Sequence, residues 1–339
     1  EDYSFDFNEC VQKSMSQMNM DEQESRRYSS RLSKDNVAQV VVLESVMSRV
    51  IVSAVQQAMN NKNGARPNLK EGEAQASTSS SKICVVNTHI YSNQTFPEVK
   101  LWQTWTLLQE VERCCNLFQI QQQQVINNMA ASNSAGVITQ ELGLVVCGDF
   151  NSEPTSAVYE LLKHGVVGYR HHPELEASSN ENMAHKIRVL PELDSITHNL
   201  ELSSVMDTAF RNEPVFTNYT TAYKGTLDYI FFTPSVIRVL AAMDMPDEYD
   251  ILQVNIGLPN VRYPSDHLML CVDCSLAVNI KPMSILPASS MVSATDGTRS
   301  SRRYNGSSGN SGTPVKTILS NIPPIKKIQS NSRHIIHQP

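Results

Sequence analysis

The sequence predicts an α/β or α+β fold, and three observations lead to this prediction. Short apolar runs of the kind that form buried strands recur along the chain. Segments with the periodicity of amphipathic helices, and long polar loops, separate these runs. The hydrophobic content of 40% is sufficient for a globular core, and 339 residues fit one large or two modest domains.

Strands are expected at the apolar runs. The predicted strands are VAQVVVLESV (37–46), KICVVNTHI (82–90), ELGLVVCGDF (141–150), two strands within GTLDYIFFTPSVIRVLAAM (225–243) that Pro234 separates, and HLMLCVDCSL (267–276).

Helices are expected between several of these strands. Residues 97–118 place apolar side chains on one helical face and begin with Pro97, which favours a helix start. The Gln-rich residues 119–136 are of low complexity and extend that helix by a few turns at most. A second helix is expected from Ser156 to Lys163. Residues 59–81 and 168–200 are predicted to be loops.

The composition divides the chain at about residue 280. Residues 280–339 are rich in Ser, Asn and Pro and basic, and such a segment cannot bury enough apolar surface to fold alone. We therefore predict one folded domain over residues 1–279 and a disordered tail over residues 280–339. Two alternatives remain for this tail: it binds RNA or another partner, or it contacts only solvent.

Charge and cysteine usage exclude some classes of function. The formal net charge of −6 argues against nucleic-acid binding through overall positive charge, but not against a local basic channel. The seven cysteines have no regular framework, which indicates reduced thiols in an intracellular protein. No run of 18 apolar residues exists, and the first residues do not resemble a signal peptide, so no membrane association is expected.

Polar residues at the ends of four predicted strands form the candidate site. These residues are Asn87, Thr88 and His89, then Asp149 and Asn151, then Asp228, and finally Asp266 and His267. Each group alone is a weak signal, but charged groups beside buried strands rarely occur together without metal or catalytic work. Oxygen donors with histidine and no paired thiolates suit Mg²⁺ or Mn²⁺ better than zinc, and Mg²⁺ held by carboxylates usually acts on phosphates.

The motifs NTHI, CGDFNSEP, TLDYIFF and PSDHLML, in this order, resemble those of the endonuclease/exonuclease/phosphatase superfamily, which has the DNase I-like fold. Residues 216–234 and 257–270 closely resemble the carbon-catabolite-repressor type of poly(A) deadenylase, to which nocturnin is related. The resemblance covers roughly residues 4–276. It implies a four-layer sandwich of two stacked mixed sheets flanked by helices.

The resemblance also implies roles for the site residues. Asp149 and Asn151 would lie at the metal and the phosphate and position the attacking water, and Asp266 would also lie at the metal. His267 would contact the scissile phosphate and move a proton, while Asp228 would orient His267.

Three further positions match residues that bind substrate in this family. His89 would contact a phosphate oxygen. Asn218 and Tyr223 would hold the terminal adenine, since an amide can pair with an adenine edge and a phenol ring can stack on the base. A proline that usually lines the adenine pocket aligns with Gln94, which weakens the expected base packing.

The sequence also departs from the family pattern at its start. YSFDFNECV (3–11) resembles the family strand that follows the one carrying the principal metal ligand, a glutamate. The strand with that glutamate has no counterpart here, so the fold is expected to be incomplete at the N-terminus. Glu110 and Glu112 do not replace it, because they follow NTHI and fall within the predicted helix that begins near Pro97. The chain is either an incomplete gene model or a truncated form without hydrolytic activity.

The function implied is that of a Mg²⁺-dependent 3′-to-5′ exoribonuclease that shortens poly(A) tails of mRNA and releases AMP. Two alternatives remain open: a nocturnin-like phosphatase acting on a small nucleotide, and an inactive module that binds RNA or a decay complex. Poly(A) RNA is the expected partner, and a deadenylation complex is a further one, although the chain has no leucine-rich repeats. The cytoplasm is the expected location, with the nucleus as the alternative.

Overall fold

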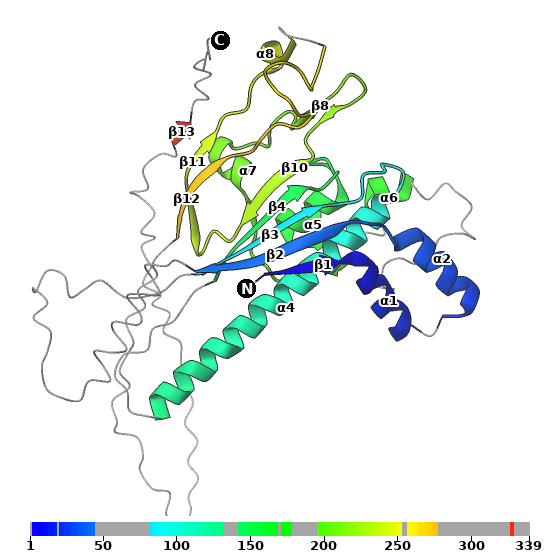
Figure 1. Cartoon of the computed structure of the whole chain (residues 1–339), viewed down its shortest axis with the longest axis vertical. Coiled ribbons are helices and arrows are strands. Elements are labelled where there is room, and N and C mark those ends of the chain that lie inside the picture. The colour runs from blue at the N-terminus through cyan, green and yellow to red at the C-terminus, as the bar shows by residue number, and fades with distance from the viewer. Residues whose placement is uncertain are drawn as a thin grey trace, which may run out of the picture. The chain divides into compact units, whose positions relative to one another are not determined.

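A computed structural model describes residues 2–18, 20–44, 82–131, 142–168, 171–177, 195–252, 256–276 and 326–328. Figure 1 shows the arrangement of these segments. The predicted loop at residues 59–81 and most of the predicted tail lie outside the described residues.

The strands in this part of the chain are β1 (Asp2–Asp6), β2 (Val37–Glu44), β3 (Lys82–His89), β4 (Leu142–Asp149), β5 (Val166–Val167), β6 (Ile196–Thr197), β7 (Ser203–Ser204), β8 (Asn218–Tyr219), β9 (Lys224–Gly225), β10 (Asp228–Phe232), β11 (Ile237–Met243), β12 (Val272–Leu276) and β13 (Lys326–Ile328).

The helices are α1 (Phe7–Gln17), α2 (Glu22–Leu32), α4 (Pro97–Ala131), α5 (Ala157–His164), α6 (Pro173–Ala177), α7 (Val205–Phe210) and α8 (Glu248–Leu252). None of the helices in the described ranges is long and apolar enough to cross a membrane.

Six of the described strands form the main sheet, in the order β1-β2-β3-β4-β10-β7. β3 and β4 run parallel, whereas the other neighbours in this sheet are antiparallel. The connection between the two parallel strands includes the long helix α4, as is usual for a parallel pair. The prediction of a mixed α/β structure is therefore confirmed.

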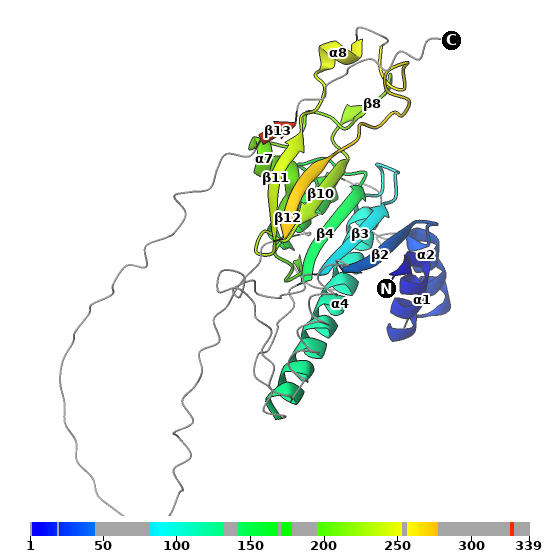
Figure 2. The same ribbon diagram turned by 60° about the vertical axis from the view of Figure 1, so that its left-hand side comes forward.

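The main core lies between this sheet and the helices. Alternate residues of the strands, such as Val86, Leu144, Val146 and Phe231, bury their side chains against α1, α2, α4 and α5. Figures 1 and 2 show α4 and α5 covering the same face of the sheet. The two-residue period of the strands thus assigns one face of the sheet to the helices.

The second face of the main sheet is covered over β4 and β10. There the antiparallel pair β11 and β12 packs through Ile237, Val239 and Leu276 against Val145 and Ile230. The described sheet of β12, β11 and β13 is the smaller of the two layers. The three described residues of the predicted tail form β13, which pairs in parallel with β11.

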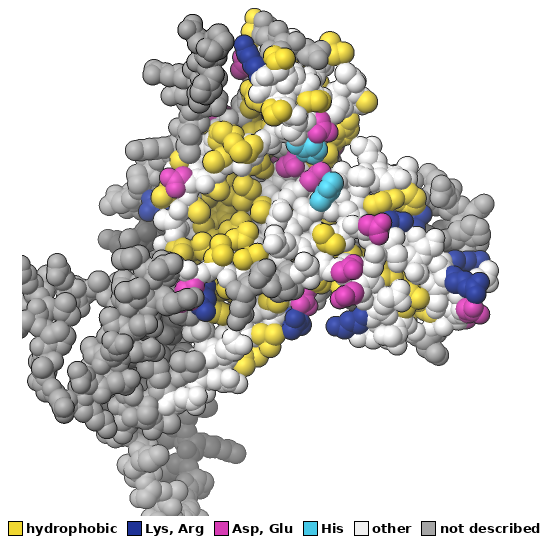
Figure 3. Space-filling view, in the orientation of Figure 1, with side chains coloured by type: hydrophobic (Ala, Val, Ile, Leu, Met, Phe, Trp, Pro, Cys, Tyr) yellow, Lys and Arg dark blue, Asp and Glu magenta, His cyan; other side chains and the backbone are white. Residues whose placement is uncertain are grey.

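The same face is more exposed over β2. Val37 and Leu43 are 56% and 53% exposed, and Val41 is half-buried. Figure 3 shows hydrophobic side chains gathered on this face beside acidic and histidine side chains. The face that carries the candidate site is therefore apolar and partly open to solvent.

Three sequence predictions need correction. Residues 168–200 were expected to be irregular, but the described part of this range includes α6 and β6. YSFDFNECV was expected to be a strand throughout, but residues from Phe7 onward form α1. Asp6 begins that helix, because its side chain accepts a hydrogen bond from the backbone nitrogen of Asn8. The strand expected from His267 begins only at Val272, because the backbone of Leu268 donates to Thr217 before the chain joins β11.

We expect Leu144→Ala to lower the free energy of unfolding by about 2–5 kcal/mol, because it leaves a cavity in the core between the sheet and the helices. Urea denaturation followed by circular dichroism would measure this change. Val37→Ala, at an exposed position of β2, is the control and should change stability by less than about 0.5 kcal/mol. Equal effects of the two substitutions would contradict the assignment of the core face.

Candidate functional site

The register of three neighbouring strands places the predicted site residues in one row. His89 at the end of β3 lies opposite Asp149 at the end of β4, and Asp149 lies opposite Asp228 at the start of β10. Directly opposed residues point to the same face of a sheet. Since Val146 and Phe231 alternate with them and face the helices, this row lies on the other face of the sheet.

A close contact between backbones supports this row. Gly148 precedes Asp149 and has a φ of +142°, and a Cβ atom at this position would lie 1.9 Å from the carbonyl oxygen of Thr88. Only glycine avoids that clash. The glycine of the GDFN motif therefore allows β4 to approach β3 closely just before the carboxylate.

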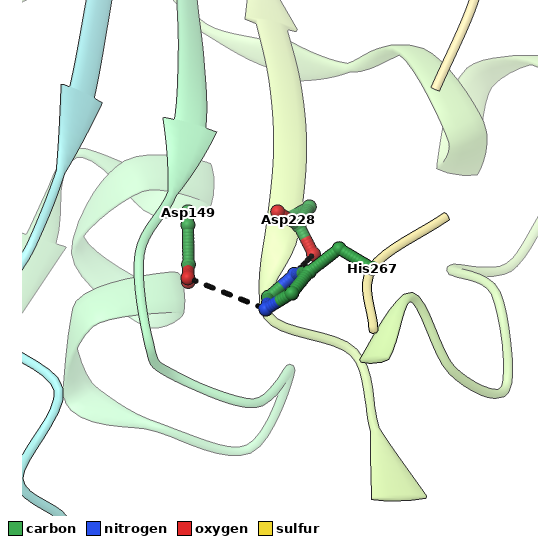
Figure 4. Close-up of side chains that lie close together, drawn as sticks. All are labelled: Asp149, Asp228 and His267. Atoms are coloured by element: carbon green, nitrogen blue, oxygen red, sulfur yellow. Dashed lines mark hydrogen bonds and ion pairs between the residues drawn. The ribbon is translucent and has the colours of Figure 1, made fainter. Parts of the chain in front are cut away.

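His267 joins the row from a loop. Its backbone forms a bridge with Asn218, and the next residue, Leu268, donates to the carbonyl oxygen of Thr217 at 2.7 Å. The imidazole Nδ1 lies 2.7 Å from Oδ2 of Asp228, and Nε2 lies 3.8 Å from Oδ2 of Asp149. Figure 4 shows the imidazole between the two carboxylates. The structure thus brings together the histidine and the two acids that the sequence predicted.

Thr217 holds Asp228 in place and was not singled out from the sequence. Its buried hydroxyl donates to Oδ2 of Asp228 at 2.6 Å, and accepts hydrogen bonds from the backbone nitrogens of Leu227 and Asp228. In the sequence, Thr217 could have been identified as a site residue by its position next to Asn218 in the motif FTNY. The same carboxylate oxygen therefore receives both Thr217 and His267, which fixes the orientation of the imidazole.

Burial and neighbouring charges shift the pKa of Asp149. Burial and the negative charge of Asp228 raise the pKa of this carboxyl, and they outweigh the hydrogen bond from the backbone of Asn151 and the charges of His267 and His89, which lower it. Its Oδ2 lies 3.4 Å from Nε2 of His89. Asp149 is thus a carboxylate held between two imidazoles, where a further positive charge would favour its ionised form.

The pKa of His267 is shifted by opposing causes. Burial acts to lower it, but the hydrogen bond and charge of Asp228, together with the charges of Asp149 and Asp266, raise the pKa above the ordinary value for histidine. The structure therefore favours an imidazolium whose Nδ1 donates to Asp228. Its Nε2–H then faces Asp149 and the open side of the row.

Asn151 lies beside Asp149 in a left-handed turn with a φ of +48°. Its backbone nitrogen donates to Oδ1 of Asp149 at 2.8 Å, and its side-chain amide donates to the carbonyl oxygen of Ile90 at 2.9 Å. Asparagine adopts this conformation more readily than most residues. The GDFN motif thus forms a compact turn at the end of β4.

The side chain of the buried Lys100 reaches the same turn from α4, and the sequence analysis did not single it out. Its Nζ donates to the carbonyl oxygen of Asn151 at 2.5 Å. Burial lowers the pKa of this lysine, while the charges of Glu174, Asp149 and Glu153 oppose that shift. A charged residue between the buried Val99 and Leu101 was the available signal in the sequence.

The predicted adenine-binding residues lie in one hairpin. Asn218 of β8 pairs with Gly225 of β9, and Tyr223 lies in the turn between them. The buried amide of Asn218 donates to Oδ2 of Asp266 at 3.5 Å, and the hydroxyl of Tyr223 donates to Oε1 of Glu153 at 2.8 Å. Their role toward adenine stays a prediction.

The donor set fits a divalent cation in part. Asp149, Asp228 and His267 each offer a ligand atom, and these atoms lie within 4.8 Å of one another. Asp228 already receives two hydrogen bonds on one oxygen, so Asp149 is the acid of this group that best suits a metal. Asp266, also predicted as a metal ligand, is outside this group and contacts Asn218 instead.

Glu110 and Glu112, which the sequence analysis rejected as metal ligands, lie on α4. Glu110 pairs with Arg113, and Glu112 accepts a hydrogen bond from the side chain of Asn199. Both are helix residues, as the sequence predicted, although they are half-buried rather than exposed.

We expect Asp228→Asn to lower the pKa of His267 in the metal-free protein. The substitution removes the charge that raises this pKa, and burial then favours the neutral imidazole. An NMR titration of the imidazole resonances would measure the change. Asp273→Asn, at an exposed position of β12, is the control and should leave the titration unchanged. A pKa of His267 that stays at the wild-type value in Asp228→Asn would contradict this account.

Known proteins are similar in sequence to this chain. Residues 89–267, more than half of the chain, match the Endonuclease/Exonuclease/phosphatase family. The protein "Carbon catabolite repressor protein 4 homolog 2" of Arabidopsis thaliana is 30% identical over 290 residues, which span 80% of this chain and 39% of that protein. The protein "CCR4-Not complex 3'-5'-exoribonuclease subunit Ccr4" of Aspergillus niger is 34% identical over 193 residues, 56% of this chain and 28% of that protein.

Solved structures that align with this chain include ANGEL2, described as a 2',3'-cyclic phosphatase and bound to adenosine-2',3'-vanadate. It has a TM-score of 0.49 and 23% identity, and the match covers 80% of this chain and 65% of ANGEL2. The human nocturnin catalytic domain with bound sulfate has a TM-score of 0.35 and 20% identity, over 72% and 54% of the two chains. With the match over residues 89–267, the chain belongs to the endonuclease/exonuclease/phosphatase family.

Proposed function

We propose that this protein is a 3′-to-5′ exoribonuclease that hydrolyses phosphodiester bonds of poly(A) tails and releases AMP. The observation that carries the proposal is the row of His89, Asp149 and Asp228, which His267 completes. The similarity to plant and fungal proteins of the carbon-catabolite-repressor type, at about 30% identity, supports the choice of RNA as substrate.

His267 is the group that we propose to act on the scissile phosphate. With Nδ1 committed to Asp228, its Nε2–H can donate to a phosphate oxygen and stabilise the charge that develops there. Asp228 and Thr217 keep the ring in this orientation. His89, 68% exposed at its side chain, would contact a second phosphate oxygen.

Mg²⁺ or Mn²⁺ would be held by Asp149, together with Asn151, and would neutralise charge on the phosphoryl group. Asp149 would also accept a hydrogen bond from the water that attacks the phosphorus. Asn218 and Tyr223 would receive the terminal adenine at the hairpin of β8 and β9.

The wider assignments remain parts of the same proposal. They are the four-layer sandwich of two stacked sheets, the division into a catalytic domain over residues 1–279 and a tail over residues 280–339, and a location in the cytoplasm or nucleus. All seven cysteines are free, which suits such a location. The Aspergillus relative is named as a CCR4-Not complex subunit, so a deadenylation complex is the proposed protein partner.

A gel assay tests the proposal directly. The purified chain is incubated with 5′-labelled RNA that ends in a tract of adenosines, with Mg²⁺ or with EDTA. We expect stepwise shortening that needs Mg²⁺ and stops where the adenosines end. Shortening that continues equally through other sequence would contradict poly(A) specificity. Release of phosphate from a small nucleotide, without shortening of the RNA, would favour a nucleotide phosphatase.

Variants of the site give the second test. His267→Ala should reduce the rate of shortening by about 10²–10⁴-fold, because it removes the proposed proton donor. Asp149→Ala should also abolish most of the activity, since it removes the central carboxylate of the row. Asp273→Ala, an exposed carboxylate on β12, is the matched control and should keep the wild-type rate. Wild-type activity in Asp149→Ala would rule out this site as the catalytic one.

A further inference from the structure

The environment of Lys100 is unusual for a lysine. The residue lies in the first turns of α4 and is only 4% exposed, between Val99 and Leu101 of the main core. A charged group is expensive to bury unless it is paired and hydrogen-bonded. The position therefore calls for an account of what the ammonium group does there.

The hydrogen bond of Lys100 is made to the backbone of the site. Its Nζ donates to the carbonyl oxygen of Asn151, 51 residues later in the chain. Glu174, Asp149 and Glu153 surround the ammonium at longer range and stabilise its charge. The carboxylate of Glu174 itself accepts a hydrogen bond from the backbone nitrogen of Ala157, at the start of α5. Lys100 thus joins α4 to the turn at the end of β4.

The turn is held at several other points. The carbonyl oxygen of Asp149 accepts a hydrogen bond from Ile90, and the nitrogen of Phe150 donates to Leu227. The nitrogen and the side-chain amide of Asn151 bind Asp149 and Ile90. Of the polar groups of Asn151 with a described contact, its carbonyl oxygen is the one that faces α4.

We propose that Lys100 is a positioning residue of the proposed phosphodiesterase site. By binding the carbonyl oxygen of Asn151, it fixes the left-handed turn that sets the side chains of Asp149 and Asn151. It does not touch the substrate. The proposal rests on the proposed function for its catalytic part, but the effect on the turn can be measured without activity.

Hydrogen exchange of the full-length, metal-free chain measures this effect. Lys100→Met keeps a long apolar side chain and removes the ammonium group. We expect the amides from Phe150 to Glu153 to exchange about tenfold faster or more, because a hydrogen bond to a charged group is lost. Thr104→Val is the matched control. It changes a buried side chain on the same helix whose hydroxyl has no described partner, and it should leave exchange in this turn unchanged.

Kinetics on adenosine-ended RNA separate positioning from general stability. We expect Lys100→Met to lower kcat by about tenfold or more with KM unchanged, because the turn positions the reacting groups and does not bind the RNA chain. Lys100→Arg, which keeps a cationic donor, should restore both protection of the turn and kcat in large part.

The outcomes distinguish the two proposals. Unchanged exchange in Lys100→Met, or an equal rise in Thr104→Val, would overturn the positioning role. If Lys100→Met does not fold, Lys100→Arg decides. The positioning role is supported if protection of the turn and kcat are both kept or are both lost in this variant. The role is refuted if only one of the two is lost. If the wild-type chain degrades no RNA, the proposed function fails, while hydrogen exchange still decides what Lys100 does.

Discussion

The register of the neighbouring strands β3, β4 and β10 is the constraint on which the site depends. It places His89, Asp149 and Asp228 opposite one another, on the face of the sheet away from the helices. A shift of one strand by a single residue would turn its acidic residue toward the core, since side chains alternate between the faces. The buried Val146 and Phe231 prevent such a shift, because it would bring them out of the core. Packing on one face of the sheet therefore determines the chemistry on the other.

Loops add what the sheet alone does not provide. His267 reaches Asp228 because its backbone is tied to Asn218, and Leu268 to Thr217. The hydroxyl of Thr217 also binds Asp228, so one short segment orients both partners of the hydrogen bond between acid and imidazole. Small movements of this segment would affect the imidazole and its acid together.

The sequence predicts the parts of this architecture that depend on local pattern. Apolar runs that end in Asp149, or begin just after Asp228, showed both the strands and the residues at their ends. Patterns of that kind cannot show where a side chain turns in a loop, and Asp266 contacts Asn218 instead of joining the group around Asp149. The role of Lys100 depends on a carbonyl group 51 residues away, which no local pattern contains. Phe7 was placed in a strand by resemblance to the family, whereas Asp6 caps a helix that begins at Phe7.

The length of α4 has a consequence for how the protein unfolds. Its 35 residues extend for about 50 Å, roughly twice the length of an eight-residue strand. Among its described side chains, none after Val111 is buried. The helix is thus part of the cooperative unit formed with the sheet as far as Phe118, since Cys115 packs against the core and Lys82 lies over the ring of Phe118. Beyond Phe118 it depends more on its own backbone hydrogen bonds and on pairs such as Gln123 with Asn127. Its helicity is therefore expected to decline gradually on heating, ahead of the sharp transition of the core.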